Sequence, residues 1–210
     1  MKIVIIDYGM GNVRSVLRGV EKVGYRATVT DRVEDILGAD KVIFPGVGAF
    51  GDGMRELKSR ELDQIITTYV QTGRPLLGIC IAMQLLFDNS EEHGFHKGLG
   101  LLPGKIIRIP ETEDGKTVRK IPHIGWNVVR PSQDSSWGGT IFDKIRGGES
   151  CYFVHSFMAM VEHKEDLLAA CDYEGIEITA AVRRDNVTGL QFHPEKSGAV
   201  GLGLLKQFLD

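Results

Sequence analysis

Cysteine is scarce in this sequence. The 210 residues include three cysteines, Cys80, Cys151 and Cys171, which lie far apart and form no CxxC pair. Disulfide frameworks and structural zinc sites need cysteines that are paired or closely spaced, so we expect neither of them. An odd number of isolated thiols fits a reducing compartment, and no motif calls for a metal or another cofactor.

Long apolar runs and blocks of one charge are missing as well. The first apolar run, Ile3–Ile6, stops at Asp7, and no uncharged stretch reaches the roughly 18 residues of a membrane span. The 25 Lys and Arg residues and the 28 Asp and Glu residues give a formal net charge of −3. Without a basic cluster, binding to nucleic acid or to a membrane is not expected. The sequence therefore predicts a cytoplasmic protein that acts on small metabolites or binds another protein.

Apolar runs and amphipathic segments alternate in the first half of the chain. This order is typical of βαβ units in a parallel sheet that helices cover on both faces. A chain of 210 residues is long enough for one such core and short for two, so we expect a single domain over residues 1–210. The apolar runs lie at residues 2–7, 41–46 and 74–79, and amphipathic segments lie between them at 13–23 and 61–72.

Beyond Gly104, short β-like runs replace this alternation. They predict additional strands that extend a mostly parallel, doubly wound α/β sheet, followed by a closing amphipathic helix. Two polar segments, at 110–120 and 131–139, predict exposed loops. The expected strands lie at residues 104–110, 151–157, 166–173, 178–184 and 187–193, and the helix lies at 198–210.

Cys80 stands between an apolar, strand-like run and a helix-like segment. A thiol at this junction projects from a sharp turn, as in a nucleophile elbow, and the helix N-terminus favours its thiolate form. A buried core cysteine is the simpler interpretation of such a run. Gly78 favours the elbow because a sharp turn needs small residues on both sides, and a second glycine would fit best at the mirror position, Ala82.

A nucleophilic thiol needs a base, which His193 and Glu195 can supply. The imidazole exchanges protons while the carboxylate fixes its tautomer. Taken alone, His-Pro-Glu is more typical of a solvated loop. The pair gains weight because it follows a predicted strand and is expected at the same sheet edge as Cys80.

A glycine-rich loop follows the predicted strand at 41–46. Gly46 and Gly48 flank Val47, and glycines here let a backbone N–H approach a reacting oxygen, as in an oxyanion hole. A plain turn explains the same residues.

A second loop offers a rival interpretation. Gly9 and Gly11 match the start of a dinucleotide-binding fingerprint, and Asp31 lies near the place of a ribose-binding acid. Arg14 replaces the third glycine and would crowd the helix–strand contact that the fingerprint needs, which argues against dinucleotide binding.

Taken together, these motifs resemble the class I glutamine amidotransferases, whose elbow reads G-x-C-x-G-x-Q. Here the elbow is GICIAMQ. More narrowly, DYGMGN, FPGVGAF, PHIGWN, YFVHSF and FHPEKS are similar to the glutaminase subunits of imidazole glycerol phosphate synthase, nearly end to end. FHPE is shared across the class, whereas DYGMGN, GWN and the Lys-Ser after FHPE are typical of this branch.

The resemblance implies the flavodoxin-like fold of that class and a glutaminase that forms a γ-glutamyl thioester. Cys80 would be the nucleophile, His193 the general base and acid, and Glu195 the residue that orients the histidine. The resemblance further assigns the oxyanion hole to Gly46, Val47, Gly48 and Ile81, and the L-glutamine pocket to Gln84, Glu92, His155 and Ser156. Glu92 has a clear physical task there, which is to pair with the α-ammonium of the substrate.

The resemblance also implies a partner, a (β/α)₈-barrel cyclase that uses the ammonia to make imidazole glycerol phosphate and aminoimidazole carboxamide ribotide. One α/β domain leaves no room for this second activity. The positions that match the family's interface are Asn12, Trp126, Tyr152 and Lys196. Core positions for the two aromatic residues and a solvated position for the lysine are the simpler interpretations.

Three alternatives stay open. Ala82 replaces the family's second elbow glycine, and its methyl group is expected to crowd the turn at about 1 kcal/mol, which keeps an inactive scaffold open. The glutaminase of another synthase, such as the one that makes pyridoxal phosphate, would lack PHIGWN and FHPEKS. A redox sensor or chaperone of similar fold would carry a histidine directly after the nucleophile, where Ile81 stands.

Overall fold

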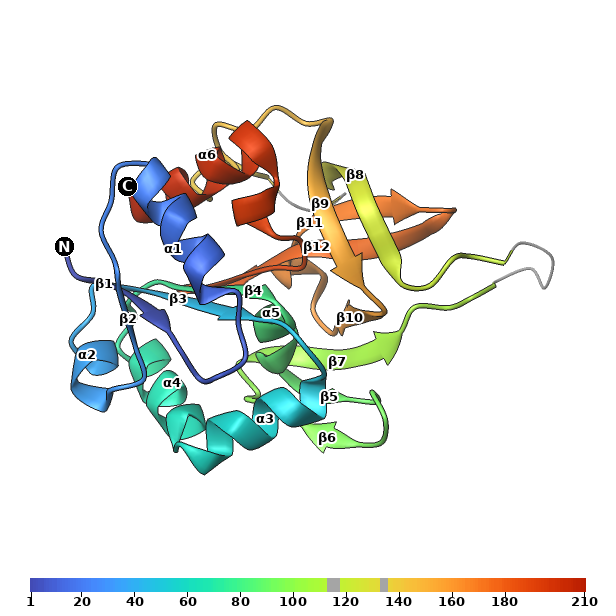
Figure 1. Cartoon of the computed structure of the whole chain (residues 1–210). Coiled ribbons are helices and arrows are strands. Elements are labelled where there is room, and N and C mark those ends of the chain that lie inside the picture. The colour runs from blue at the N-terminus through green and yellow to red at the C-terminus, as the bar shows by residue number, and fades with distance from the viewer. Residues whose placement is uncertain (113–117, 133–135) are drawn as a thin grey trace.

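A nine-stranded sheet runs through the computed structural model, which describes residues 1–112, 118–132 and 136–210 (Figure 1). From edge to edge its strands are β2 (Thr28–Thr30), β1 (Ile3–Ile6), β3 (Lys41–Gly46), β4 (Leu76–Cys80), β13 (Val187–Leu190), β12 (Ile176–Arg184), β11 (Leu167–Tyr173), β8 (His123–Pro131) and β9 (Glu149–His155). The strands from β2 to β13 are parallel, and those from β12 to β9 continue the sheet in antiparallel pairs. The parallel part corresponds to the predicted βαβ units, and most of the antiparallel part to the predicted additional strands.

Helices cover both faces of this sheet, as predicted for a doubly wound fold (Figure 1). On one side lie α1 (Val13–Lys22) and α6 (Gly198–Leu209), and on the other α2 (Val33–Leu37), α3 (Phe50–Ser59), α4 (Leu62–Gln71) and α5 (Ile81–Leu85). In β1, Ile3 and Ile5 pack with α1 and α6, while Val4 and Ile6 pack with α3 and α4. Successive side chains point to opposite faces, and both faces are covered, so the strand is apolar throughout.

A second sheet has four strands, in the order β10 (Phe157–Val161), β7 (Leu102–Arg108), β5 (Phe87–Ser90) and β6 (His96–Lys97). The apolar run at 104–110 lies largely in β7, and the run at 151–157 divides at Ser156 between β9 and β10. The expectation that both runs extend the main sheet is therefore wrong for β7 and β10. Apolar, β-branched residues predict a strand, but they do not specify its neighbours.

The two segments predicted as exposed loops are partly buried. Trp137 is buried and its indole N–H donates to the carbonyl of Leu168 at 3.0 Å, and Arg119 is buried as well. Pro131 is the last residue of β8. The rest of the prediction at 113–117 and 133–135 lies outside the described residues. Within the described ranges, no helix is long and apolar enough to cross a membrane.

The fold brings several predicted residues to one edge of the sheet. In parallel strands the carboxyl ends point the same way, and here Gly46 ends β3 and Cys80 ends β4 directly opposite it. His193 follows β13, the next strand across, and a short 3₁₀ helix, η2 (Pro194–Lys196), holds Glu195.

Candidate active site

Cys80 occupies a sharp turn between β4 and α5. Its φ of 58° and ψ of −116° lie in a region that non-glycine residues rarely adopt. A Cβ atom on Gly78 would lie 2.9 Å from Leu86 and 3.2 Å from the backbone of Met83, so the turn has no room for a side chain there. The thiol is 7% exposed, and its sulfur lies 4.0 Å from the carbonyl oxygen of Val154.

Ala82 does not show the expected backbone strain. It lies inside α5, is fully buried, and is not among the described residues with positive φ, so its backbone suits any residue. The strained residue of the elbow is Cys80 itself. The expectation of strain at Ala82 is therefore wrong, because the helix begins at Ile81, one residue before it.

His193 and Glu195 form a buried ion pair. The imidazole Nδ1 lies 2.8 Å from Oε1 of Glu195, and the two side chains are 2% and 0% exposed. Burial alone would lower the pKa of His193, but hydrogen bonds and charge interactions with Cys80 and Glu195 outweigh it and raise this pKa to about 10. The ring is therefore charged at neutral pH.

Ser197 holds this pair in register with β9. Its hydroxyl donates to the carbonyl of His193 at 2.6 Å and accepts the backbone N–H of Tyr152 at 2.9 Å. The backbone N–H of His193 also donates to the carbonyl of Tyr152 at 3.0 Å. The Lys-Ser that follows FHPE thus contributes a buried hydroxyl that fixes the backbone of the candidate base.

The glycine loop leads from β3 over the same turn. A Cβ atom on Gly46 would collide with Tyr8 and with Ile81, so only glycine fits beside the elbow. Gly48 has a φ of 111°, which side chains rarely adopt, and Val47 between them is 41% exposed. The backbone N–H of Ile81 stands at the start of α5, next to Cys80.

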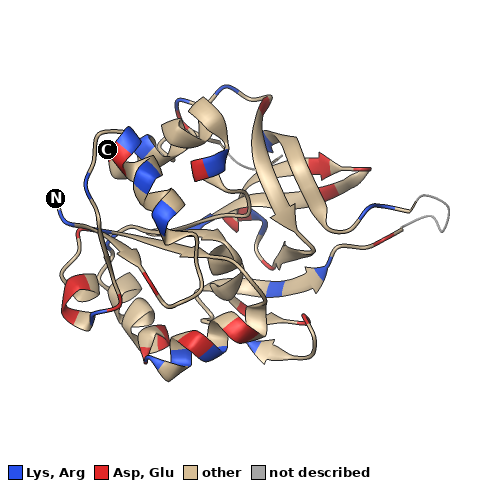
Figure 2. Ribbon diagram, viewed as in Figure 1, with Lys and Arg blue, Asp and Glu red and all other residues tan. Residues whose placement is uncertain are grey.

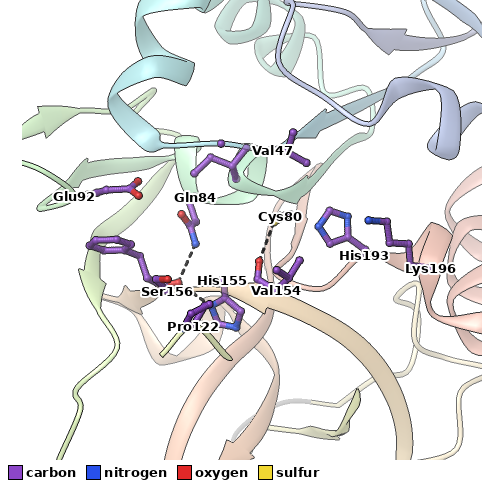
Figure 3. A pocket seen from close by; sticks show the side chains of 13 residues that line it. Val47, Cys80, Gln84, Glu92, Pro122, Val154, His155, Ser156, His193 and Lys196 are labelled. Carbon is purple, nitrogen blue, oxygen red and sulfur yellow. Dashed lines mark hydrogen bonds between the residues drawn. The ribbon is translucent and has the colours of Figure 1, made fainter. Parts of the chain in front are cut away.

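These elements enclose a cavity of about 410 Å³. That volume is ample for one amino acid. Figure 3 shows Cys80, His193 and Lys196 along one part of the cavity and Glu92 at the other end, with its carboxylate pointing toward Gln84. The lining residues are Val47, Gly48, Cys80, Ile81, Gln84, Glu92, Pro122, Val154, His155, Ser156, Phe157, His193 and Lys196.

Glu92 links the cavity to the glycine loop. Its Oε2 accepts the backbone N–H of Phe50 at 2.6 Å, at the N-terminus of α3, which begins two residues after Gly48. The positive end of a helix stabilises a carboxylate in this position. A ligand ammonium group would therefore meet a fixed carboxylate.

Both ring nitrogens of His155 have hydrogen-bond partners within the protein. Nδ1 lies 2.8 Å from the carbonyl oxygen of Phe157, and Nε2 lies 2.9 Å from Nδ1 of His123. Burial lowers the pKa of His123 to about 4 and that of His155 to about 3, so both rings are neutral at pH 7. His155 lines the cavity but holds the turn between β9 and β10 rather than presenting a free nitrogen.

Of the four residues predicted at a partner interface, Lys196 lines the cavity and the other three are not among its lining residues. Trp126 is 58% exposed and its ring lies 6.1 Å from that of Tyr152, while the ammonium of Lys196 lies 6.0 Å from the Tyr152 ring. The core interpretation is thus wrong for Trp126. Asn12 caps α1 without a side-chain hydrogen bond to the helix.

An exposed apolar strip continues from Trp126 along β8. Ile124 and Val128 are 58% and 45% exposed on the same face as Trp126, because alternate residues of a strand share a face. In Figure 2 the ribbons of β8 and β9 are uncharged along most of their length, whereas α3 carries charges of both signs. The sequence analysis missed Ile124 and Val128, although their alternation in HIGWNVV was visible.

Two further buried polar residues near the cavity were missed. The Tyr8 hydroxyl is buried beside Gly46, has no hydrogen-bond partner among the described residues, and has a pKa that burial and the nearby charge of Cys80 raise. Gln191 is fully buried and contacts Gln84. The signal for Gln191 was a lone amide in the apolar run before His193, whereas no pattern pointed to Tyr8.

The residues of the rival dinucleotide-binding interpretation contact another part of the protein, the side chain of Arg60. Asp31, expected near a ribose, lies 3.3 Å from the guanidinium of Arg60. The same arginine lies against Gly9, where an added Cβ atom would be 3.0 Å from it. The acid of that interpretation is thus engaged within the protein.

Comparison with known proteins decides the family. The profile described as Glutamine amidotransferase class-I matches residues 4–210. The imidazole glycerol phosphate synthase subunit HisH of Syntrophotalea carbinolica is 49% identical, over 99% of both chains. The chain belongs to the HisH branch of the class I glutamine amidotransferases.

Other relatives agree with this HisH assignment. The HisH subunit of Geobacter metallireducens is also 49% identical, over 98% of this chain and 96% of its own. The structure of PurLQS from Thermotoga maritima has a TM-score of 0.71 and covers 99% of this chain and 97% of its own, at 21% identity, which shows the shared fold. The predicted fold class and the predicted family resemblance are confirmed. The glutaminase of another synthase and a redox thiol protein are not supported for this HisH chain.

Proposed function

We propose that this HisH chain hydrolyses L-glutamine through a thioester on Cys80 and passes the ammonia to a (β/α)₈-barrel cyclase subunit. The observation that carries the proposal is the elbow cysteine, which lines the same cavity as His193, while His193 in turn pairs with the buried Glu195. The relatives are named as subunits of imidazole glycerol phosphate synthase, so the ammonia would serve the synthesis of imidazole glycerol phosphate and aminoimidazole carboxamide ribotide.

The first half-reaction forms the thioester. The Cys80 sulfur attacks the carboxamide carbon of glutamine, and the carbonyl oxygen gains a negative charge that backbone N–H groups of Ile81 and of the loop Gly46–Gly48 would stabilise. The C–N bond then breaks, and the His193 imidazolium gives its proton to the leaving nitrogen. Ammonia leaves uncharged, and the γ-glutamyl group stays on sulfur.

The second half-reaction releases glutamate. A water molecule attacks the thioester carbon while His193, now neutral, takes a proton from it. The C–S bond breaks and the sulfur leaves as a thiolate beside the newly protonated imidazole. Glu195 keeps Nδ1 of the ring occupied, so that Nε2 faces the reacting atoms throughout.

Recognition of glutamine follows from the charges around the cavity. Glu92 offers a carboxylate to the α-ammonium, and Gln84, Ser156 and the backbone near His155 supply polar contacts along the pocket. We propose that His155 acts through its hold on Phe157 and not through a free ring nitrogen.

A partner is required because bulk water protonates free ammonia and removes its nucleophilicity. The exposed strip Ile124–Trp126–Val128, with Tyr152 and Lys196 beside the cavity, is the surface on which we propose that the cyclase docks. Aromatic and apolar residues of this kind are enriched at interface centres. We include Asn12, at the N-cap of α1, in the same proposed docking surface.

Glutamate release tests the proposal directly. The rate is measured for the chain alone, with the cyclase, and with the cyclase and its phosphorylated ligand. We expect slow release from the chain alone and a rise of about 10² to 10³ in the loaded complex, the usual effect of completing an oxyanion hole. Cys80→Ser is the matched control and should abolish release, because a serine hydroxyl is barely ionised near neutral pH.

Two outcomes would overturn the proposal. Substantial release by Cys80→Ser would remove the thiol from the mechanism. A cyclase that still needs this chain when ammonium salts are supplied would show that the chain is not an ammonia donor.

A further inference from the structure

Gln191 is a buried amide that the steps described above do not use. It follows β13, and its backbone N–H still donates to the carbonyl of Ala180 at 2.9 Å, as in the adjoining ladder. The residue is 0% exposed. A buried amide lowers stability unless its polar atoms find partners, and here Oε1 has a partner while Nε2 has none among the described residues.

The side chain of Gln191 is one of two acceptors that hold the amide of Gln84. The amide nitrogen of Gln84 donates to Oε1 of Gln191 at 2.8 Å and to the carbonyl oxygen of Phe157 at 3.0 Å. An amide nitrogen has two hydrogens, so both are spent on these two acceptors. Rotating the amide by 180° would place its oxygen against the Phe157 oxygen, which is unfavourable.

The oxygen of Gln84 is consequently left for the cavity. Gln84 lines that cavity, and Figure 3 shows it between Cys80 and Glu92, with the Glu92 carboxylate pointing toward it. One oxygen of Glu92 is held by the backbone N–H of Phe50. Two acceptor groups thus face the same end of the cavity, where they suit a ligand with several N–H donors and a positive charge.

We propose that Gln191 is a positioning residue that locks the Gln84 amide with its oxygen toward the α-ammonium of the bound amino acid. The inference rests on the proposed glutaminase function and specifies how that site selects an α-amino acid over other carboxamides. Gln191 touches no substrate and acts through Gln84 alone. Without it, the amide of Gln84 rotates more freely and presents its N–H₂ group to the ammonium part of the time.

The test compares two substrates in the ligand-loaded complex. L-glutamine carries the α-ammonium, and 4-carbamoylbutanoate has the same chain and carboxamide without it. Gln191→Met removes the acceptor at similar volume, and Gln191→Glu keeps an acceptor oxygen at the same place. Thermal unfolding of each variant is measured first, and Gln191→Asn, whose oxygen is one methylene short, replaces the Met variant if that variant does not fold.

We expect Gln191→Met to raise KM for L-glutamine about tenfold with little change in kcat, the scale of one hydrogen bond to a charged group. The value of kcat/KM for 4-carbamoylbutanoate should change less than about threefold, and Gln191→Glu should stay close to the parent with both substrates. Gln84→Met should show the same selective loss, and the Gln84→Met/Gln191→Met double variant should lose no more than either single variant.

Equal losses with both substrates would contradict the inference, because they would mean that Gln191 only supports the core. An unchanged KM for L-glutamine in Gln191→Met would contradict it as well. A parent complex that hydrolyses neither substrate would instead refute the proposed function, so the two failures are distinct.

Discussion

Cys80 is one of the non-glycine residues at which the described chain departs from ordinary backbone geometry. A non-glycine residue in this region stores about 1 to 3 kcal/mol of strain, which the surrounding packing must hold. Gly78 has no side chain and so fits the tight turn, and Gly46 likewise leaves space for the side chains of Tyr8 and Ile81. These close approaches explain why glycines at fixed distances from a cysteine are a signal of such a site in the sequence.

The His193–Glu195 pair makes a graded prediction. We expect His193→Asn to lower turnover at least about a hundredfold, the usual scale for losing a general acid and base. Glu195→Gln should lower turnover less, since the ring keeps its position through Ser197 and the η2 backbone. Steady-state rates of glutamate release in the loaded complex check both. Small and equal losses would mean that this pair is a structural loop.

The structure changes the expected effect of the substitution Ala82→Gly. The sequence suggested that Ala82→Gly would relieve strain, but Ala82 lies in α5 with a negative φ. Glycine in a helix is about 1 kcal/mol less favourable than alanine. We therefore expect Ala82→Gly to lower the free energy of unfolding by about that amount and to leave turnover within a few fold. Urea denaturation and a glutaminase assay measure the two effects, and a more stable glycine variant would show that the methyl group does crowd the elbow.

At the level of the elements, the sequence predicted those with long, regular patterns. The run at 41–46 coincides with β3, and the amphipathic segments at 13–23 and 61–72 contain α1 and α4. The helix α3 was missed because two glycines interrupt it. The strand β5 was missed because one residue separates it from α5 and three of its four residues are polar, so no apolar run or alternation marks it.

The sequence predicted more of the candidate site than of the fold around it. The sequence reveals reactive residues by their type and spacing, as it did for Cys80, His193 and Glu195. The order of the strands then brings them together. Gln191 and His123 act through partners distant in sequence, such as Gln84 and His155. Such contacts exist only once the strands are paired, so no local pattern reveals them.

The pairing of β8 with β9 makes a pH-dependent prediction. His123 and His155 are neutral in the fold, with lowered pKa values, whereas in the unfolded chain both take up a proton below about pH 6.5. The unfolded state then binds more protons, so stability should fall as the pH drops from about 6.5 toward 4. His193 is charged in the fold throughout this range and takes up its proton near pH 6.5 in the unfolded chain, so it opposes the effect of the pair near pH 6.5 and adds almost no slope below about pH 5.5.

The variant His123→Gln isolates this effect because glutamine can still donate to His155 but does not titrate. We expect its free energy of unfolding, measured by urea denaturation, to fall less steeply than that of the parent between pH 6.5 and 4.5, by up to about 1.4 kcal/mol per pH unit. The two proteins are compared at matched ionic strength. Parallel curves would mean that the histidine pair does not contribute to the acid sensitivity.

The whole molecule places the thiol site beside an exposed, largely uncharged region of β8 and β9 (Figure 2). Lys196 belongs to both regions, since it lines the cavity and lies over Tyr152 at the strip. Docking of the cyclase on this strip would cover the cavity on that side. Ammonia formed at Cys80 would then leave toward the partner and not toward water.

Isotope transfer measures this central claim most directly. The complex is supplied with amide-¹⁵N-labelled glutamine, the cyclase substrate and an excess of unlabelled ammonium, and the label in imidazole glycerol phosphate is read by mass spectrometry. The account predicts product carrying mostly ¹⁵N with the parent chain, and product carrying only unlabelled nitrogen with Cys80→Ser. Product from the parent chain that carries the isotope ratio of the bulk ammonium would contradict it, because the ammonia would then have passed through the solvent.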